Sequence, residues 1–214
     1  HIIGMLSESE TYPEKVLNSA YLFKANGNVV SRHDKVTLLS FIETSFLESS
    51  LKIPFVSEMI FSNILSGDSF EPLKSKYGHL GVIICNESIS PYETLELVRN
   101  DAELIVVLSN DAWVENTHLV DSHFHSVRCR AIESGLDAIV NSNRGISGLI
   151  EGNGDIIIQG QSSDAQCVTG KVNLRKAGTF YSTFGDWFIY LGICVFLISF
   201  VISYISKRYF QSST

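Results

Sequence analysis

The chain has 214 residues, which is enough for one full-sized domain with a large hydrophobic core. Its formal net charge of −7 argues against a nucleic-acid-binding protein, because neutralising phosphates requires a basic surface. The cysteines show neither a CxxC pair nor a regular spacing, which argues against both a disulfide framework and a zinc site. They are Cys85, Cys129, Cys167 and Cys194. The chain opens at His1 within an apolar segment, so we interpret it as a piece cut inside a domain.

The N-terminal part has the pattern of a small antiparallel sheet. Residues 1 to about 35 predict a strand, a loop, and two further strands separated by a turn. The run Asn18–Phe23 is apolar and aromatic, and Ala25–Asn28 contains an Asn-Gly pair, so a hairpin is expected there. Residues from about 40 to 76 have no long period, which indicates a long loop. Such a loop inside a compact domain is more often functional than idle.

The central part alternates buried strands with helices. The short apolar run Leu80–Cys85 has the composition of a strand that is covered on both faces. Ser90 is placed to cap a helix that starts at Pro91. The remaining elements are predicted in the order helix Pro91–Asn100, strand Glu103–Ser109, helix 119–134, strand Leu136–Asn141, and a hairpin over Gly145–Ile150 and Asp155–Gln159. This alternation, with hairpins at the flanks, predicts an α/β sandwich.

The C-terminal part changes character after Asp186. From Trp187 to Ser206 no side chain is charged, and this length is close to what a helix needs to cross a bilayer. A soluble core helix of this length would rarely be apolar on every face, so we predict a transmembrane helix. Lys207 and Arg208 favour a cytoplasmic C-terminus. The predicted organisation is a domain over 1–180, a membrane helix over 187–206 and a basic tail over 207–214.

Cys85 is the sharpest local candidate for chemistry, because it ends a buried strand and precedes a helix. A helix N-terminus stabilises a thiolate. By position alone, however, a core residue that ends a strand is the better interpretation of Cys85. Lys35 and Glu43 lie eight residues apart after the early strands, where a lone charge is usually solvated. Individually these signals are weak.

Together, the motifs of the chain resemble the nitrilase (carbon-nitrogen hydrolase) superfamily, and more closely its apolipoprotein N-acyltransferase branch. The resemblance runs in order over nearly the whole chain. The matching motifs are His33-Asp34-Lys35-Val36, Ile84-Cys85-Asn86-Glu87, Leu108-Ser109-Asn110-Asp111-Ala112-Trp113, Arg130-Ala131-Ile132-Glu133-Ser134-Gly135, Asn143-Arg144-Gly145-Ile146-Ser147 and Gly185-Asp186-Trp187. Ordinary amidases of the superfamily share the lysine and cysteine positions but lack the membrane anchor. The Asn-Asp-Ala-Trp motif and the anchor therefore favour the acyltransferase branch.

The resemblance implies a nitrilase-like αββα sandwich, truncated at its N-terminus and followed by the membrane helix. It implies that Cys85 is a nucleophile and that Lys35 stabilises the oxyanion, with Glu43 and Glu87 as supporting residues. Neither cofactor nor metal is implied. The expected reaction moves an acyl chain from a phospholipid, through a Cys85 thioester, to the N-terminal amine of a diacylglyceryl-cysteine lipoprotein. The expected location is the bacterial inner membrane, with the catalytic domain on its extracytoplasmic side.

The sequence also departs from the family pattern. The family's general-base glutamate belongs to a segment upstream of Ile2, so we expect the 214-residue chain by itself to be inactive. Asn86 replaces a tyrosine, and Ser40-Phe41-Ile42 replaces Pro-Phe-Gly beside the site. We interpret the other polar candidates structurally. In that interpretation His118, His123 and His125 lie on a helix face rather than on a metal, Trp113 packs near the site, Cys129 and Cys167 are core or surface thiols, Cys194 faces lipid or a neighbouring helix, and Asn141 and Asn143 satisfy buried backbone.

Two other functions stay open at this point. A membrane-tethered amidase would use the same residues to hydrolyse small C–N bonds, with water instead of an amine resolving the acyl-enzyme. A degenerate, non-enzymatic membrane domain is the second alternative.

Overall fold

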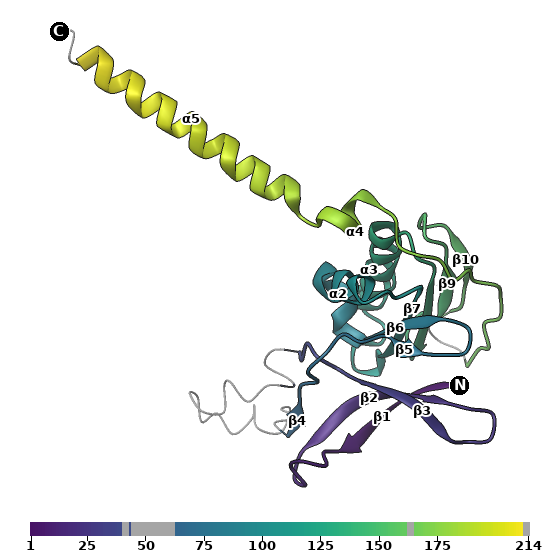
Figure 1. Ribbon diagram of the computed structural model, residues 1–214. Coiled ribbons are helices and arrows are strands. Elements are labelled where there is room, and N and C mark those ends of the chain that lie inside the picture. The colour runs from purple at the N-terminus through teal and green to yellow at the C-terminus, as the bar shows by residue number, and fades with distance from the viewer. Residues whose placement is uncertain (40–42, 44–62, 162–164, 212–214) are drawn as a thin grey trace.

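The computed structural model describes residues 1–39, 43, 63–161 and 165–211. The substituted Ser40-Phe41-Ile42 stretch, and much of the long loop predicted from residue 40, lie outside these residues. The described residues form two β-sheets packed face to face, a helical layer on one of them, and a long helix that projects away from the domain (Figure 1).

The first sheet is antiparallel apart from one short strand. It contains β1 (Ile2–Glu8), β2 (Val16–Phe23) and β3 (Val29–Asp34), with β4 (Ile64–Leu65) parallel to β2. The predicted hairpin between β2 and β3 is confirmed. Gly27 takes a φ of 84° in its turn, a conformation that glycine adopts without steric cost, and the Lys24 N–H donates to the Asn28 carbonyl at 2.9 Å.

The second sheet has six strands in the order β10-β9-β8-β7-β6-β5. The central three run parallel to one another, so their carboxyl ends meet at one edge of the sheet. The strands are β5 (Leu73–Lys74), β6 (His79–Ile84), β7 (Leu104–Asn110), β8 (Ala138–Asn143), β9 (Gly148–Ile150) and β10 (Ile156–Gln159). The predicted strands and the predicted C-terminal hairpin are therefore confirmed, with shifts of a few residues at their ends.

The central strands are apolar throughout because both of their faces are covered. Ile83 of β6 and Val107 of β7 belong to the core beneath the helices. Val82 and Leu108 belong to the core between the two sheets, together with Ala20 of β2. The helices of this layer are α2 (Pro91–Arg99) and α3 (His118–Ser134), which follow β6 and β7 in the chain. As crossover connections of the second sheet, both helices lie on its outer face.

The expected αββα sandwich is therefore only partly found. Within 1–39, 63–161 and 165–211, helices cover the second sheet alone, and the layers are sheet, sheet and helix. Among these residues, β1, β2 and β3 follow one another without an intervening helix, so these connections supply no second helical layer. In keeping with this, Ile3 of β1 is exposed.

Local capping sets the helix ends. The Ser90 hydroxyl accepts from the Tyr92 N–H, so the predicted N-cap of α2 is confirmed. Thr117 caps α3 in the same way through Leu119 N–H. Gly135 ends α3 in the left-handed conformation with a φ of 73°, which favours glycine.

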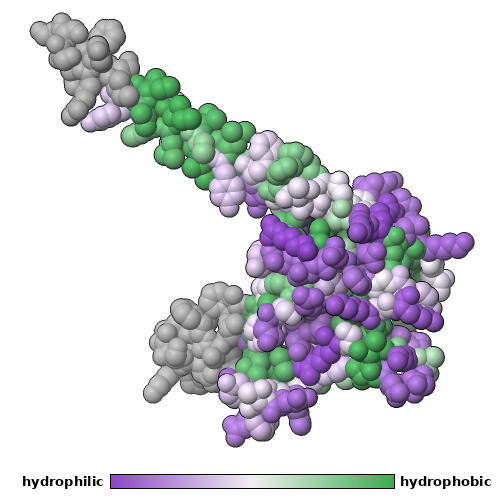
Figure 2. Space-filling model, in the orientation of Figure 1, coloured by the Kyte–Doolittle hydropathy of each residue, from purple (hydrophilic) through white to green (hydrophobic). Residues whose placement is uncertain are grey.

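The chain ends in α4 (Phe180–Phe184) and α5 (Trp187–Gln211). Every side chain of α5 from Trp187 to Tyr204 is exposed, and this part is long and apolar enough to cross a membrane. Figure 2 shows its hydrophobic surface extending away from a domain whose visible face is largely hydrophilic. The helix continues to Gln211, so residues 207–211 of the predicted basic tail are helical.

Candidate active site

Cys85 sits at a strained turn between the end of β6 and the short 3₁₀ helix η2 (Cys85–Ile89). Its φ is 55°, in the left-handed region, which costs a residue with a side chain about 1–2 kcal/mol. The thiol is half-buried. A chain that turns this sharply directs the side chain out of the sheet edge. Strain of this kind is concentrated at functional sites.

Glu87 fixes this turn to the rest of the molecule. Its side chain is 1% exposed, and its Oε2 accepts the Ile84 N–H at 2.8 Å. Its Oε1 accepts the N–H groups of Val36 at 2.8 Å and Thr37 at 2.9 Å. Burial raises the pKa of Glu87, while these three hydrogen bonds and the charge of Lys35 oppose the rise. The carboxylate thus ties the Cys85 turn to the segment that follows β3.

Lys35 and Glu43 form a buried ion pair beside the turn. The Lys35 Nζ lies 2.6 Å from the Glu43 Oε2, and their side chains are 1% and 11% exposed. The same Glu43 oxygen accepts the Leu39 N–H at 2.6 Å. A fully buried lysine is rare unless it is paired, so Lys35 departs from the solvated state that is usual for a lone lysine. Buried charges of this kind at a pocket are candidates for chemistry.

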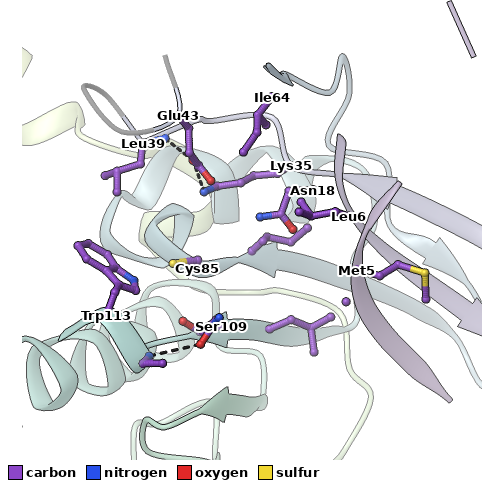
Figure 3. Close-up of a pocket in the computed structure, with 15 residues that line it drawn as sticks. Met5, Leu6, Asn18, Lys35, Leu39, Glu43, Ile64, Cys85, Ser109 and Trp113 are labelled. Carbon is purple, nitrogen blue, oxygen red and sulfur yellow. Dashed lines mark hydrogen bonds and ion pairs between the residues drawn. The ribbon is translucent and has the colours of Figure 1, made fainter. Parts of the chain in front are cut away.

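Cys85, Lys35 and Glu43 share one pocket of about 490 Å³ (Figure 3). The other lining side chains are mostly apolar, and Trp113, predicted to lie near the site, is among them. The full lining consists of Gly4, Met5, Leu6, Asn18, Lys35, Leu39, Glu43, Ile64, Ile84, Cys85, Leu108, Ser109, Asn110, Ala112 and Trp113. The residues proposed from the sequence as catalytic therefore lie together, with the supporting Glu87 behind the turn. Asn141 and Asn143, predicted to satisfy buried backbone, are exposed.

His123 of α3 belongs to this site, although the sequence interpretation grouped it with His118 and His125. Its Nε2 lies 2.8 Å from the Cys85 carbonyl oxygen, and its Nδ1 lies 2.9 Å from Asp111 Oδ1. His118 and His125 are exposed. The spacing in the sequence could have separated His123 from the other two histidines. His123 follows the buried Val120 by three residues and precedes the buried Val127 by four, which places it on the buried face of the helix.

The surroundings of His123 and Asp111 favour the charged form of both side chains. Burial works to lower the pKa of His123, but its hydrogen bonds to Asp111 and the Cys85 carbonyl outweigh burial and raise it. Burial works to raise the pKa of Asp111, but hydrogen bonds from His123, Ser109 and Ser142 outweigh burial and lower it. The charged histidine therefore stabilises the fold below about pH 6.5, and this contribution is lost as the pH rises through the raised pKa.

Metal binding does not fit this cluster. The Cys85 thiol, one Asp111 oxygen and one His123 nitrogen lie within 4.8 Å of one another, as ligands of one ion could. Both His123 ring nitrogens are, however, already held by hydrogen bonds to acceptors. A metal ligand needs a free lone pair on the imidazole, so the observed contacts favour a hydrogen-bonded network.

Gly145 offers a test of how tightly this network is packed. A Cβ at Gly145 would lie 2.2 Å from Asp111 Oδ2 and 2.3 Å from Ser142 Oγ. We expect Gly145→Ala to destabilise the protein by about 1–3 kcal/mol through overpacking, measured by thermal or urea unfolding. Gly178→Ala is the matched control, because a Cβ there meets no atom within 4 Å. Equal stability of the two variants would show that the Asp111 network tolerates displacement.

Known proteins resemble this chain over most of its length. Curated relatives named apolipoprotein N-acyltransferase include one from Geobacter metallireducens, 29% identical over 176 residues, which covers 81% of this chain and 33% of the relative. Another, from Thermotoga maritima, is 29% identical over 210 residues, which covers 92% of this chain and 40% of the relative. The chain thus spans about a third to two fifths of the length of these relatives.

Solved structures share the fold at lower identity. The Helicobacter pylori G27 carbon-nitrogen hydrolase matches with a TM-score of 0.59 at 18% identity, over 77% of this chain and 58% of that one. Nit3 from Saccharomyces cerevisiae, a member of branch 10 of the nitrilase superfamily, matches with a TM-score of 0.57 at 21% identity, over 76% and 55%. The family model described as carbon-nitrogen hydrolase matches residues 1–180, and the chain therefore belongs to the carbon-nitrogen hydrolase family.

Proposed function

We propose that this chain carries the thioester-forming site of a membrane-bound N-acyltransferase. In this proposal Cys85 takes an acyl chain from a phospholipid and passes it to the N-terminal amine of a diacylglyceryl-cysteine lipoprotein. The observation that carries the proposal is the half-buried Cys85 thiol, on a strained turn, opening into an apolar pocket beside the buried Lys35. The names of the curated relatives support the same reaction.

The first half-reaction follows from the arrangement of Cys85 and Lys35. The Cys85 thiolate attacks the ester carbonyl, and the ammonium of Lys35 stabilises the tetrahedral oxyanion. The thiol proton passes to a general base, which the family resemblance assigns to a segment upstream of Ile2. The ester C–O bond then breaks, and the lysophospholipid oxygen takes up a proton. Pairing with Glu43 holds the ammonium in place beforehand.

In the second half-reaction the lipoprotein amine attacks the thioester carbonyl. The C–S bond breaks, the amine loses a proton, and the Cys85 thiol is restored. Atoms therefore balance without a cofactor or a metal. The apolar lining by Met5, Leu6, Leu39, Ile64 and Trp113 suits an acyl chain better than a small amide, because desolvating apolar atoms against one another is favourable.

Membrane attachment is part of the proposal. Helix α5 would cross the bilayer, and the domain would lie on the extracytoplasmic side of a bacterial inner membrane. An exposed aromatic cluster lies at the base of this helix: the Phe180 ring is tilted against Phe184 with ring centroids 4.5 Å apart and meets Trp187 edge-on at 5.5 Å. Aromatic rings of this kind favour the interface between lipid and water.

The full-length protein in detergent tests the reaction. After incubation with phospholipid, mass spectrometry of the Cys85 peptide should show an acyl adduct that hydroxylamine removes. Addition of a diacylglyceryl-cysteine peptide should discharge the adduct and yield the N-acylated peptide. Cys85→Ser should abolish the thioester, and the exposed Cys129 serves as the internal control that stays unmodified. Turnover of small amides without any adduct from phospholipid would favour the amidase and reject this proposal.

The native cysteines also test the membrane arrangement. In sealed membranes, a membrane-impermeant maleimide added from the extracytoplasmic side should label Cys129 and Cys167, which are exposed on the domain. Cys194 lies within α5 and should stay unlabelled until the protein is denatured, because lipid would cover it. Peptide mass spectrometry separates the three sites. Labelling of Cys194 as fast as Cys129 in intact membranes would contradict a lipid-embedded α5.

A further inference from the structure

The contacts of His123 leave one protonation state that satisfies all of them. Its Nε2 faces the Cys85 carbonyl at 2.8 Å, and its Nδ1 faces the Asp111 carboxylate at 2.9 Å. A carbonyl oxygen and an ionised carboxylate only accept hydrogen bonds, so both ring nitrogens must donate. His123 is therefore an imidazolium when both bonds are made.

Asp111 is itself held so that it can keep this charge in place. The hydroxyl of Ser109 donates to Asp111 Oδ1 and that of Ser142 donates to Oδ2, both at 2.7 Å. The Asp111 side chain is 5% exposed and that of His123 is 12% exposed. Because water has little access to this ion pair, it does not compete for the hydrogen bonds, and the two side chains keep fixed positions. Lys35 is the other cation acting on His123, and it opposes the charge of the imidazolium.

The acceptor of the Nε2 bond is the backbone of Cys85 itself. Cys85 adopts a φ of 55°, which a residue with a side chain reaches only at a cost, so contacts around it must hold the turn. On one side, Glu87 accepts the Ile84 N–H at 2.8 Å. On the other side, the His123 donor holds the Cys85 carbonyl. These two contacts flank the nucleophile, and they come from different elements, η2 and α3.

We propose that His123 is a positioning residue, which as an imidazolium anchored by Asp111 holds the Cys85 carbonyl and keeps the thiol aimed into the pocket beside Lys35. The inference rests on the proposed role of Cys85 as the nucleophile, but not on the identity of the acyl donor. His123 is not among the residues that line the pocket, and its hydrogen bond goes to the Cys85 carbonyl, although one of its ring nitrogens lies within 4.8 Å of the Cys85 thiol. Its effect is expected on the rate of Cys85 acylation rather than on phospholipid binding.

Two substitutions separate the two bonds of His123. The amide of glutamine reaches about as far as Nε2, so His123→Gln keeps a donor for the Cys85 carbonyl and gives up the contact with Asp111. The amide of asparagine reaches about as far as Nδ1, so His123→Asn keeps a donor for Asp111 and gives up the contact with Cys85. Both changes remove the positive charge. Both variants are made in the full-length protein, with thermal unfolding measured for each.

The positioning role predicts a specific order of activities. His123→Asn should acylate Cys85 about 100-fold more slowly than the wild-type protein in single turnover, with an unchanged KM for phospholipid, because a small misplacement of a reacting group costs about this much. His123→Gln should acylate Cys85 at least about tenfold faster than His123→Asn, since its donor to the Cys85 carbonyl remains. A merely structural role predicts the opposite order, because His123→Gln leaves the buried Asp111 without its histidine donor. Activities that follow the melting temperatures of the two variants would overturn the inference.

A second readout does not depend on the acyl donor. The alkylation rate of Cys85 by iodoacetamide, followed on its own peptide, should fall in His123→Asn and be partly restored in His123→Gln. If the wild-type protein forms no thioester from phospholipid, the proposed function fails while this alkylation order still tests the positioning role. Equal alkylation rates in the wild-type protein and both variants, at temperatures where all are folded, would reject the positioning role alone.

Discussion

The Lys35→Met variant is expected to acylate Cys85 about 100- to 1,000-fold more slowly than the wild-type protein, because it removes the cation proposed to stabilise the oxyanion. Methionine has a similar length and an apolar side chain, so it suits a position that is 1% exposed. The fold should therefore persist, and Glu43 keeps its bond from the Leu39 N–H. Single-turnover formation of the Cys85 thioester, followed by mass spectrometry, measures the effect.

Lys24→Met is the matched control for this experiment. Lys24 is exposed at the hairpin between β2 and β3, away from the residues that line the pocket. The same chemical change there should leave the acylation rate within about twofold, as expected for surface substitutions that touch no special feature. If Lys35→Met retained the wild-type rate while remaining folded, the oxyanion role of Lys35 would be excluded. A loss of folding in Lys35→Met, detected by its unfolding curve, would instead assign the ion pair a structural role.

Glu87→Gln is expected to lower both stability and activity. Glutamine can present only one acceptor oxygen, so its NH₂ group would face the Ile84 N–H or the Val36 and Thr37 N–H groups that the carboxylate now accepts. A buried donor left without an acceptor costs about 1–3 kcal/mol. The melting temperature should fall by roughly 2–4 °C per kcal/mol for a domain of this size. Acylation of Cys85 should slow by about 100-fold, because the turn is no longer fixed to the Lys35 segment.

Glu96→Gln provides the comparison on the neighbouring helix α2. Glu96 is partly exposed and pairs with Arg99 at i,i+3, a contact of the surface type that contributes little. Its replacement should change the free energy of unfolding by no more than about 0.5 kcal/mol and leave acylation unaltered. Should Glu87→Gln prove as stable as Glu96→Gln, the three backbone hydrogen bonds of Glu87 would not be what holds the turn.

The chemistry-bearing residues differ in how far the sequence could identify them. The end of a buried strand already singled out Cys85, whereas Lys35, Glu43 and Glu87 were identified as site residues only through the resemblance to a family. Each of the four positions alone also fits a core or surface residue. The structure brings them together, but their catalytic roles and the domain boundaries at 180 and 187 remain predictions. His123 was missed because the three histidines of α3 were interpreted as one face. Its spacing from Val120 and Val127 placed it on the buried face. Only the tertiary structure shows that it forms hydrogen bonds with Asp111 and the Cys85 carbonyl.

Features that depend on neighbours in the chain could be derived from the sequence by itself. The apolar runs of β6 and β7, the Ser90 cap before Pro91, the Asn-Gly hairpin and the uncharged stretch of α5 are all set by short-range patterns of side chains. Features that join distant segments were decided only by the tertiary structure. Glu87 reaches Val36 across 51 positions in the chain, and His123 reaches Cys85 across 38. Such contacts arise from the packing of two sheets and a helix layer, which local periodicity does not encode.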